Sequence, residues 1–122
     1  MDAHQTSRNT PWLSVIMPTF NGERTASEAL NSIWAQHDPG IEVVVVDDTS
    51  TDSTLEIVRS FSCKLNLKVL PREHTGNWVA NTNWGIANSS GTYLSFLHQD
   101  DRWEEERLAT IAKVLAAHPD LH

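Results

Sequence analysis

The chain is poor in cysteine, since Cys63 is the only one among its 122 residues. A single cysteine excludes a disulfide framework and a Cys-x-x-Cys zinc site, and it makes a reducing, cytoplasmic setting the expected one. Residues 1–11 are polar and lack the apolar segment of a signal peptide. The apolar runs elsewhere fall far short of the ~20 residues that a membrane-spanning helix needs. We therefore expect no transmembrane segment.

Basic residues are also scarce: nine Lys and Arg stand against sixteen Asp and Glu, which gives a formal net charge of −7. Nucleic-acid binding depends on clusters of Lys and Arg, so we expect no such partner. A diphosphate ligand is expected to need a divalent cation between the like charges. The chain has no Gly-x-Gly-x-x-Gly turn, which argues against a dinucleotide on a helix N-terminus, and no Gly-Lys-Ser/Thr, which excludes a P-loop.

The apolar residues alternate between strand and helix patterns along one small domain. We expect a polar tail over residues 1–11 and a folded region over residues 12–122. The patterns predict strands over 13–17, 41–46, 67–70 and 92–97, and helices near 26–34, 55–61, 78–88 and 104–117. This order predicts an α/β fold, a Rossmann-like, mostly parallel sheet flanked by helices and joined by right-handed crossovers.

Local signals suggest where these elements begin and end. Pro18 is expected to stop the first strand, and Thr25 with Glu28 forms a candidate capping box. Asp52 and Asp101 are interpreted as N-caps of the second and last helices.

Two of the predicted strands end in a pair of carboxylates, Asp47-Asp48 and Asp100-Asp101. Carboxylates at the exit of a buried strand are costly to desolvate unless they hold something cationic. Open parallel sheets bind ligands beyond the carboxyl ends of their strands, where residues 18–21, 47–48, 72–77 and 98–101 should converge. The sequence therefore predicts a site for a metal ion and a polar ligand at this edge.

Five segments in series resemble the family 2 glycosyltransferases. They are residues 13–21 (LSVIMPTFN), 45–52 (VVDDTSTD), 83–86 (NWGI), 91–94 (GTYL) and 96–103 (FLHQDDRW). The resemblance runs from about Trp12 to the end of the chain and implies a truncated glycosyltransferase A fold. It also implies transfer of a sugar from a nucleotide donor, a UDP-sugar first of all, with inversion and with Mg²⁺ or Mn²⁺. The acceptor would be a saccharide or a lipid-linked molecule of cell-envelope polysaccharide biosynthesis.

The resemblance assigns the donor side of the site by position. The backbone at Pro18 and Thr19 would cradle the base, with Phe20 beside it. Asp48 would accept a hydrogen bond from a base imide, and Asp47 would support the turn. The donor-binding set is completed by Asn21 and Gln99.

The metal side is assigned to Asp100, which would bridge through the cation to the diphosphate, with His98 as a second ligand. His98 stands where the family often has an aspartate, and Thr82 stands where it often has an arginine. Members of the fold are about twice as long, and their second half supplies the acceptor site and the catalytic base. The resemblance therefore places the base beyond His122.

Other readings remain open at this point. Asp47 and Asp48 could be turn formers at a strand end, and the chain could be a non-catalytic nucleotide-binding remnant. A receiver-like signalling module is a further alternative, although a receiver carries its acidic pair after the first strand. If the strand over 92–97 lies at an edge of the sheet, its unguarded apolar run predicts a homodimer.

Overall fold

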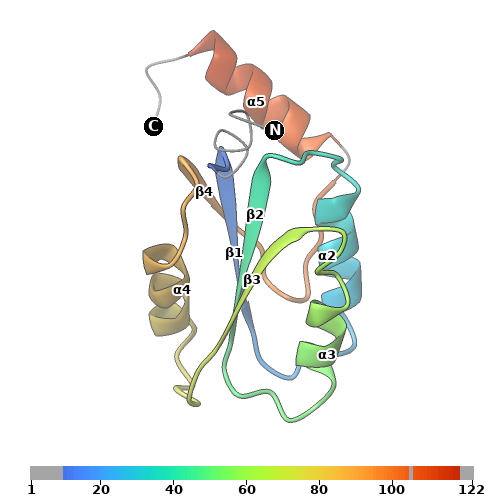
Figure 1. Ribbon diagram of the computed structural model, residues 1–122, viewed down its shortest axis with the longest axis vertical. Helices are drawn as coiled ribbons and strands as arrows, with labels where there is room; N and C mark the ends of the chain where they lie inside the picture. The colour runs from blue at the N-terminus through green and yellow to red at the C-terminus, as the bar shows by residue number, and fades with distance from the viewer. Residues whose placement is uncertain (1–9, 105, 119–122) are drawn as a thin grey trace, which may run out of the picture.

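Four parallel strands form the centre of the structure, a computed structural model that describes residues 10–104 and 106–118 (Figure 1). Their order across the sheet is β3-β2-β1-β4. β1 therefore lies between β2 and β4, the two strands that lead into the carboxylate pairs. The predicted α/β class with a parallel sheet is confirmed. The strands are β1 (Leu13–Thr19), β2 (Ile41–Asp47), β3 (Asn66–Pro71) and β4 (Tyr93–Phe96).

Helices cover both faces of this sheet. Figure 1 shows α2 (Ala26–Trp34) and α3 (Thr54–Arg59) on one face and α4 (Trp78–Ala87) on the other. The last helix, α5 (Arg107–Ala117), lies near the starting ends of the strands. No helix within residues 10–104 and 106–118 has both the length and the apolar character needed to cross a bilayer.

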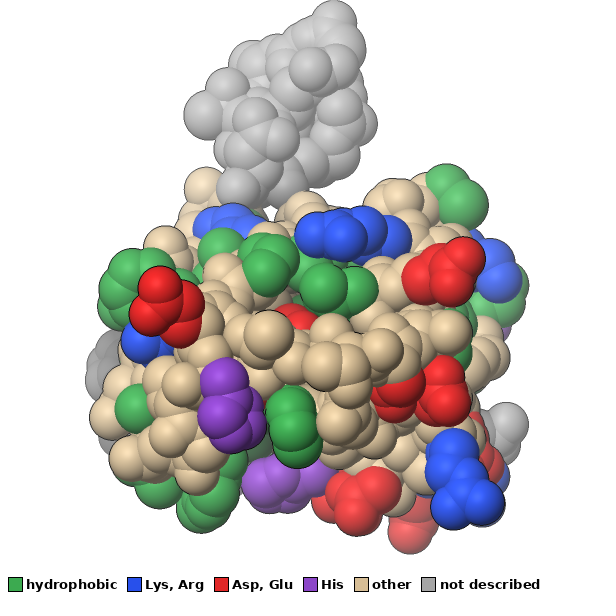
Figure 2. Space-filling view, turned by 90° about the horizontal axis from the view of Figure 1, so that it is seen from below, with side chains coloured by type: hydrophobic (Ala, Val, Ile, Leu, Met, Phe, Trp, Pro, Cys, Tyr) green, Lys and Arg blue, Asp and Glu red, His purple; other side chains and the backbone are tan. Residues whose placement is uncertain are grey.

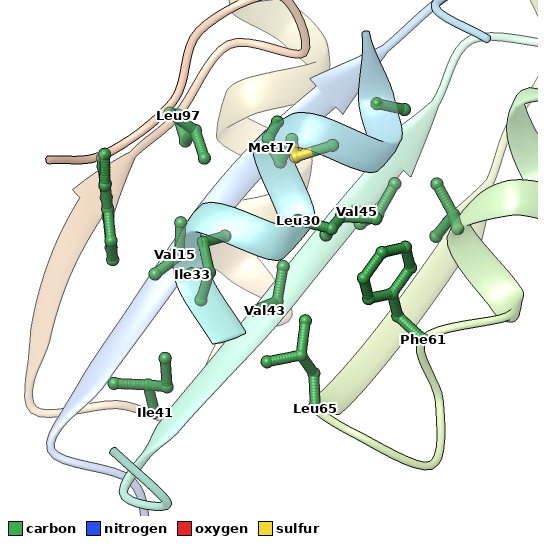
Figure 3. Packing of buried hydrophobic residues seen from close by; sticks show 14 of the residues in the cluster. Val15, Met17, Leu30, Ile33, Ile41, Val43, Val45, Phe61, Leu65 and Leu97 are labelled. Carbon is green, nitrogen blue, oxygen red and sulfur yellow. The ribbon is translucent and has the colours of Figure 1, made fainter. Parts of the chain in front are cut away.

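The core follows from the two-residue period of the strands, which sends alternate side chains to opposite faces. All seven residues of β2 are buried, as expected of a strand covered on both sides. On one face of the sheet, Val15 and Val43 pack with Leu30 and Ile33 of α2, as Figure 3 shows. Val58 of α3 belongs to the same cluster. On the other face α4 approaches closely at Gly85, where a side chain would collide with the sheet.

The predicted stop at Pro18 is wrong, because β1 continues through it to Thr19. In a parallel strand, alternate residues turn their backbone groups to opposite neighbours. The Ile16 carbonyl accepts from Leu97 N on the β4 side, and Pro18 faces that same side. Since β4 pairs with β1 only as far as Phe96, the missing N–H of Pro18 removes no ladder hydrogen bond.

The helix starts differ from prediction because tertiary contacts replace the local caps. Thr25 precedes α2 but makes no side-chain cap, and Glu28 instead pairs with Arg102 at 3.4 Å. The predicted capping box is therefore wrong. Asp52 accepts from Thr54 N at 2.9 Å but lies one residue before the cap position of α3.

The last helix begins at Arg107, so Asp101 is not its N-cap and its first turn holds no acidic residue. The chain between Asp101 and Arg107 is held against α2 by buried Trp103, whose backbone N–H donates to Ser32 Oγ at 2.9 Å. Gln36 Oε1 then accepts from Leu108 N at 2.9 Å. A glutamine from the neighbouring segment thus performs the capping that the sequence suggested for a local aspartate.

The predicted tail over residues 1–11 lies mostly outside the described residues. Within the described part, Pro11 is buried and its carbonyl accepts from Thr92 N at 3.3 Å. β4, which begins directly after Thr92, is an edge strand of the described sheet, and its Leu94 and Phe96 are about half exposed, at 42% and 50%.

Candidate functional site

A cavity of about 500 Å³ opens at the carboxyl ends of the strands, where the loops after all four strands meet. This is the edge at which open parallel sheets bind ligands. Figure 2 looks onto it and shows histidine, hydrophobic and acidic side chains close together. The cavity is lined by Pro18, Thr19, Phe20, Asp48, His74, Gly76, Asn77, Trp78, Asn81, His98, Gln99 and Asp100.

The structure brings most of the predicted site residues to this cavity. Those that line it are Pro18, Thr19, Phe20, Asp48, His98, Gln99 and Asp100. Asn21 and Asp47 do not line it. The Asn21 side chain turns away to accept a hydrogen bond from Thr51 N at 2.8 Å, in the loop after β2.

Asp47 is fully buried and braces the turn that follows β2. Its carboxylate accepts from Thr19 Oγ1 at 2.6 Å, from Ser50 N at 2.8 Å and from Ser50 Oγ at 2.6 Å. The group thereby joins the ends of β1 and β2. Its contacts to protein donors explain how a carboxylate can be buried without a cation at this position.

Asp48 is also buried, but it faces the cavity. Its carboxylate accepts from Thr75 N at 2.7 Å and Gly76 N at 3.1 Å, and His74 Nδ1 lies 2.8 Å from it. Burial raises the pKa of Asp48, but hydrogen bonds from Thr75, Gly76 and Asn81 outweigh burial and lower the pKa to about 2. Asp48 is therefore an ionised, acceptor-only group at neutral pH.

The loop after β3 is shaped to hold this carboxylate. Gly76 has a φ of 64°, a left-handed conformation that glycine adopts without strain. This conformation lets two successive N–H groups, those of Thr75 and Gly76, point to the same anion. Asn77 then caps α4 by accepting from Val79 N and Ala80 N, at 3.0 and 3.1 Å.

The backbone is strained immediately after Asp48. Thr49 has a φ of 61°, which is rare for a β-branched residue. Its Oγ1 donates to the Arg72 carbonyl at 2.5 Å, which ties the strained residue to the end of β3. Strained residues held by their surroundings cluster at functional sites, so this outlier supports the assignment of a site to the β2 end.

Phe20 lines the same cavity as Asp48 and is 44% exposed. Its ring is 5.1 Å from the His74 ring, with the two planes tilted by 39°. An exposed aromatic face next to an acceptor-only carboxylate can take a flat ring that carries an N–H donor.

Gln99 holds the loop after β1 against the loop after β4. Its Oε1 accepts from Phe20 N at 2.8 Å, and its Nε2 donates to Phe20 O at 2.9 Å. Both polar atoms of the Gln99 amide are therefore bonded to the backbone of Phe20. Gly22 leaves room for this arrangement, because a Cβ there would collide with Gln99. The geometry makes Gln99 a residue that positions Phe20, whereas the resemblance placed it among the donor-binding residues.

The β4 end of the cavity is open by comparison. His98, Asp100 and Asp101 lie in the loop after β4, with His98 and Asp100 on the cavity wall. The His98 ring meets the edge of Trp78 at 5.9 Å. Among the described residues the Asp100 carboxylate makes no hydrogen bond or ion pair, and no three metal-binding side chains come together. A cation here would have at most two ligands from these residues.

Five residues that line the cavity were given no role from the sequence: His74, Gly76, Asn77, Trp78 and Asn81. The loop over 72–77 was expected at the site, but no residue in it was given a role. Thr75-Gly76 before the capping Asn77 was a usable turn signal. Trp78 is 62% exposed and lies on the cavity wall.

Comparison with known proteins adds an independent line of evidence. The model of the family described as glycosyl transferase family 2 matches residues 14–121. The poly(ribitol-phosphate) beta-N-acetylglucosaminyltransferase TarS of Staphylococcus aureus is 41% identical over 108 residues, which cover 86% of this chain and 19% of that protein. Glycosyltransferase AglE of Haloferax volcanii is 38% identical over 109 residues, covering 84% of this chain and 36% of the relative.

Solved structures agree with the fold. Staphylococcus aureus TarS 1–349 in complex with UDP-GlcNAc matches with a TM-score of 0.85 at 39% identity, over 88% of this chain and 32% of that one. The mannosyltransferase PcManGT of Pyrobaculum calidifontis, in complex with GDP-Man and Mn²⁺, matches with a TM-score of 0.79 at 30% identity, over 88% and 33%. The chain thus spans a fifth to two fifths of these proteins, and it belongs to glycosyl transferase family 2.

Proposed function

We propose that this chain is the donor-binding half of an inverting glycosyltransferase and that it holds a UDP-sugar in the cavity at the strand ends. The observation that carries the proposal is the pair of unlike carboxylates at the two ends of the cavity. Asp48 is a buried acceptor for a base, and Asp100 is an exposed group available to a cation. The complexes of structural neighbours with UDP-GlcNAc and with GDP-Man and Mn²⁺ support this choice of ligands.

The base subsite is formed by Phe20 and Asp48, with the backbone of Pro18 and Thr19 beside them. An ionised carboxylate can only accept hydrogen bonds. Uracil presents a ring N–H in its imide, whereas the corresponding ring nitrogen of cytosine is an acceptor. Asp48 therefore favours UDP over CDP, and Phe20 offers its face to the base whichever sugar is attached.

The residues present fit a divalent cation at the β4 end. Mg²⁺ and Mn²⁺ prefer oxygen ligands, and Mg²⁺ is commonly held by one or two carboxylates together with substrate phosphates. Asp100 and His98 would be the protein ligands, and the diphosphate would supply further oxygens. When bound, the cation would neutralise the charge that develops on the leaving nucleoside diphosphate. Asp100 would help to hold the cation, and Gln99 keeps the loop after β4 in register with Phe20.

Binding measurements test this assignment. UDP should bind weakly to the chain alone and more tightly with Mn²⁺. Asp100→Ala should remove most of the gain from Mn²⁺, and Asp48→Asn should weaken binding with and without metal. CDP serves as the control ligand, since cytosine lacks the ring N–H from which Asp48 would accept a hydrogen bond. Calorimetry that shows equal UDP affinity with and without Mn²⁺ would contradict the metal bridge.

We further propose that the 122-residue chain by itself does not transfer sugar. The two carboxylates on the described cavity wall, Asp48 and Asp100, are assigned here to the base and to the cation, and without a general base an alcohol is a poor nucleophile at neutral pH. The acceptor of the whole protein is proposed to be a saccharide or lipid-linked molecule of the cell envelope, as the names of TarS and other relatives support. Sustained transfer by the purified chain would show that it is self-sufficient.

The exposed edge strand supports a proposal about assembly. β4 is short of a neighbour on one side within the described sheet, and Leu94 and Phe96 are exposed along it. We infer that a second copy of the chain pairs there, because unguarded apolar edges associate. Ser95→Lys should weaken the homodimer, and a monomer by sedimentation at tens of micromolar would contradict it. A cytoplasmic location stays a prediction that rests on the single cysteine.

A further inference from the structure

His74 occupies the base subsite in the manner expected of a nucleobase. Its flat ring lies 5.1 Å from the ring of Phe20. Its Nδ1 lies 2.8 Å from Asp48 Oδ2. A ring contact with Phe20 and an N–H donated to Asp48 are the two interactions that the proposed function gives to the base. One side chain of the loop after β3 makes both.

The Asp48 carboxylate has no acceptor capacity left while His74 is in place. Two carboxylate oxygens offer about four lone-pair positions. Oδ1 accepts from Thr75 N at 2.7 Å and Thr75 Oγ1 at 3.1 Å. Oδ2 accepts from Gly76 N at 3.1 Å and lies against His74 Nδ1, and the buried Asn81 side chain is a further donor that helps to lower the pKa of Asp48. An incoming ring N–H must therefore displace one of these donors.

The donors differ in how easily they can leave. The N–H groups of Thr75 and Gly76 belong to the loop backbone and cannot move without refolding the loop. The His74 side chain is 56% exposed, so it can rotate into water, where its nitrogens find other partners. The Thr75 hydroxyl is the second movable donor, with Asn77 O and Asn81 Oδ1 as alternatives at 3.4 Å. His74 also blocks Phe20, which the hydroxyl does not.

We propose that His74 closes the base subsite of the free chain by standing in for the base, and that the base of the donor displaces it. This inference rests on the proposed function, because it takes Phe20 and Asp48 as the base subsite. His74 is then a determinant of affinity that competes equally with every nucleotide. Binding is weakened by the fraction of chains whose subsite is closed.

Removing the imidazole should therefore strengthen binding. His74→Ala is expected to tighten binding of UDP, and of uridine without metal, by about fivefold, as expected when one competing hydrogen bond to a charged group at a half-exposed position is lost. CDP affinity should rise by a similar factor, so the ratio of UDP to CDP affinity should stay as in the original chain. His118→Ala, an exposed histidine at the end of α5, is the matched control and should change neither affinity.

Two further measurements make the test decisive. In histidine side-chain NMR spectra of the original chain, adding uridine should abolish the signal of the hydrogen bond between His74 Nδ1 and Asp48. Thr75→Val should leave uridine affinity nearly unchanged; a gain in Thr75→Val but not in His74→Ala would show that the hydroxyl yields instead.

Other outcomes are equally informative. Weaker or unchanged binding in His74→Ala would overturn the inference, and weaker binding would mean that the imidazole packs on the bound base. In either case binding that still depends on Asp48 would leave the proposed function standing. Absence of UDP and uridine binding in every variant would overturn both.

Discussion

The ends of β2 and β4 carry carboxylate pairs that look alike in sequence and differ completely in structure. Asp47 and Asp48 are 0% and 4% exposed, and their oxygens are held by donors from three loops. Asp100 and Asp101 are exposed, and their side chains make no hydrogen bond within the described part of the chain. The β2 pair is therefore held by donors of the fold, and the β4 pair has no such donors among the described residues.

Under the proposed function, this difference corresponds to two ways of binding one ligand. At the β2 end, folding already buries the carboxylates and supplies donors to them, so the Asp48 acceptor is held in position before a ligand binds. At the β4 end the carboxylates stay hydrated, and a cation can bind without breaking contacts within the fold. Gln99 joins the two ends through Phe20. Four variants or conditions should sharpen this contrast or break it.

The largest effect is expected from Asp47→Ala. The substitution leaves the hydroxyl of Thr19 and the N–H and hydroxyl of Ser50 without their acceptor in a buried place. We expect a loss of about 3 kcal/mol in the free energy of unfolding. Urea denaturation measures it, with Asp101→Ala as the matched control that should change little. Equal losses in the two variants would remove the distinction between the pairs.

The next effect comes from acid. The pKa of Asp48 is about 2 in the folded chain, below its ordinary value of 3.8, so the unfolded state binds a proton first as the pH falls. The stabilisation is present above pH 4 and is lost between about pH 4 and pH 2, with a magnitude of about 2 kcal/mol. Comparison with Asp48→Asn isolates this contribution from Glu42 and Asp52, whose pKa values are also lowered. A constant difference between the two proteins over this range would contradict it.

Gln99→Ala should have a smaller effect, about 1 kcal/mol, because its two hydrogen bonds to Phe20 lie at an exposed position. Its effect on binding should be larger than its effect on folding, since Phe20 loses its support. Gln99→Glu keeps the acceptor for Phe20 N and should recover part of the UDP affinity. If Gln99→Ala binds UDP as well as the original chain does, the two hydrogen bonds between Gln99 and Phe20 have no role in the site.

Asp100→Ala should have the smallest effect on stability, within about 0.5 kcal/mol, because the carboxylate is exposed and has no partner among residues 10–104 and 106–118. The same variant should lose most of the Mn²⁺-dependent gain in UDP affinity. Thermal unfolding with and without Mn²⁺ and UDP measures both properties. A large loss of stability without ligands would show that Asp100 belongs to the fold in the way that Asp47 does.

The sequence predicted the elements that depend on apolar period and failed where distant residues decide. The buried run of β2 and the parallel order around β1 could be predicted because β-branched runs and crossovers leave few alternatives. Tryptophans show the opposite case. Trp103 is buried against α2, whereas Trp34, on a helix with clear apolar spacing, is 41% exposed beneath Lys64. Composition does not distinguish them.

By itself the sequence determined the family, the α/β fold and the edge of the sheet where the site lies, because strand ends and turn residues are local features that topology gathers at one place. Only the tertiary structure decided what each carboxylate does. Asp47 and Asp48 are buried because the Thr19 hydroxyl and the N–H groups of Thr75 and Gly76 reach them from other strands. Asp100 stays free because no such donors face it among the described residues. The partners of a charge, supplied by distant segments, determine whether it is buried and held in place before a ligand binds or stays exposed and hydrated.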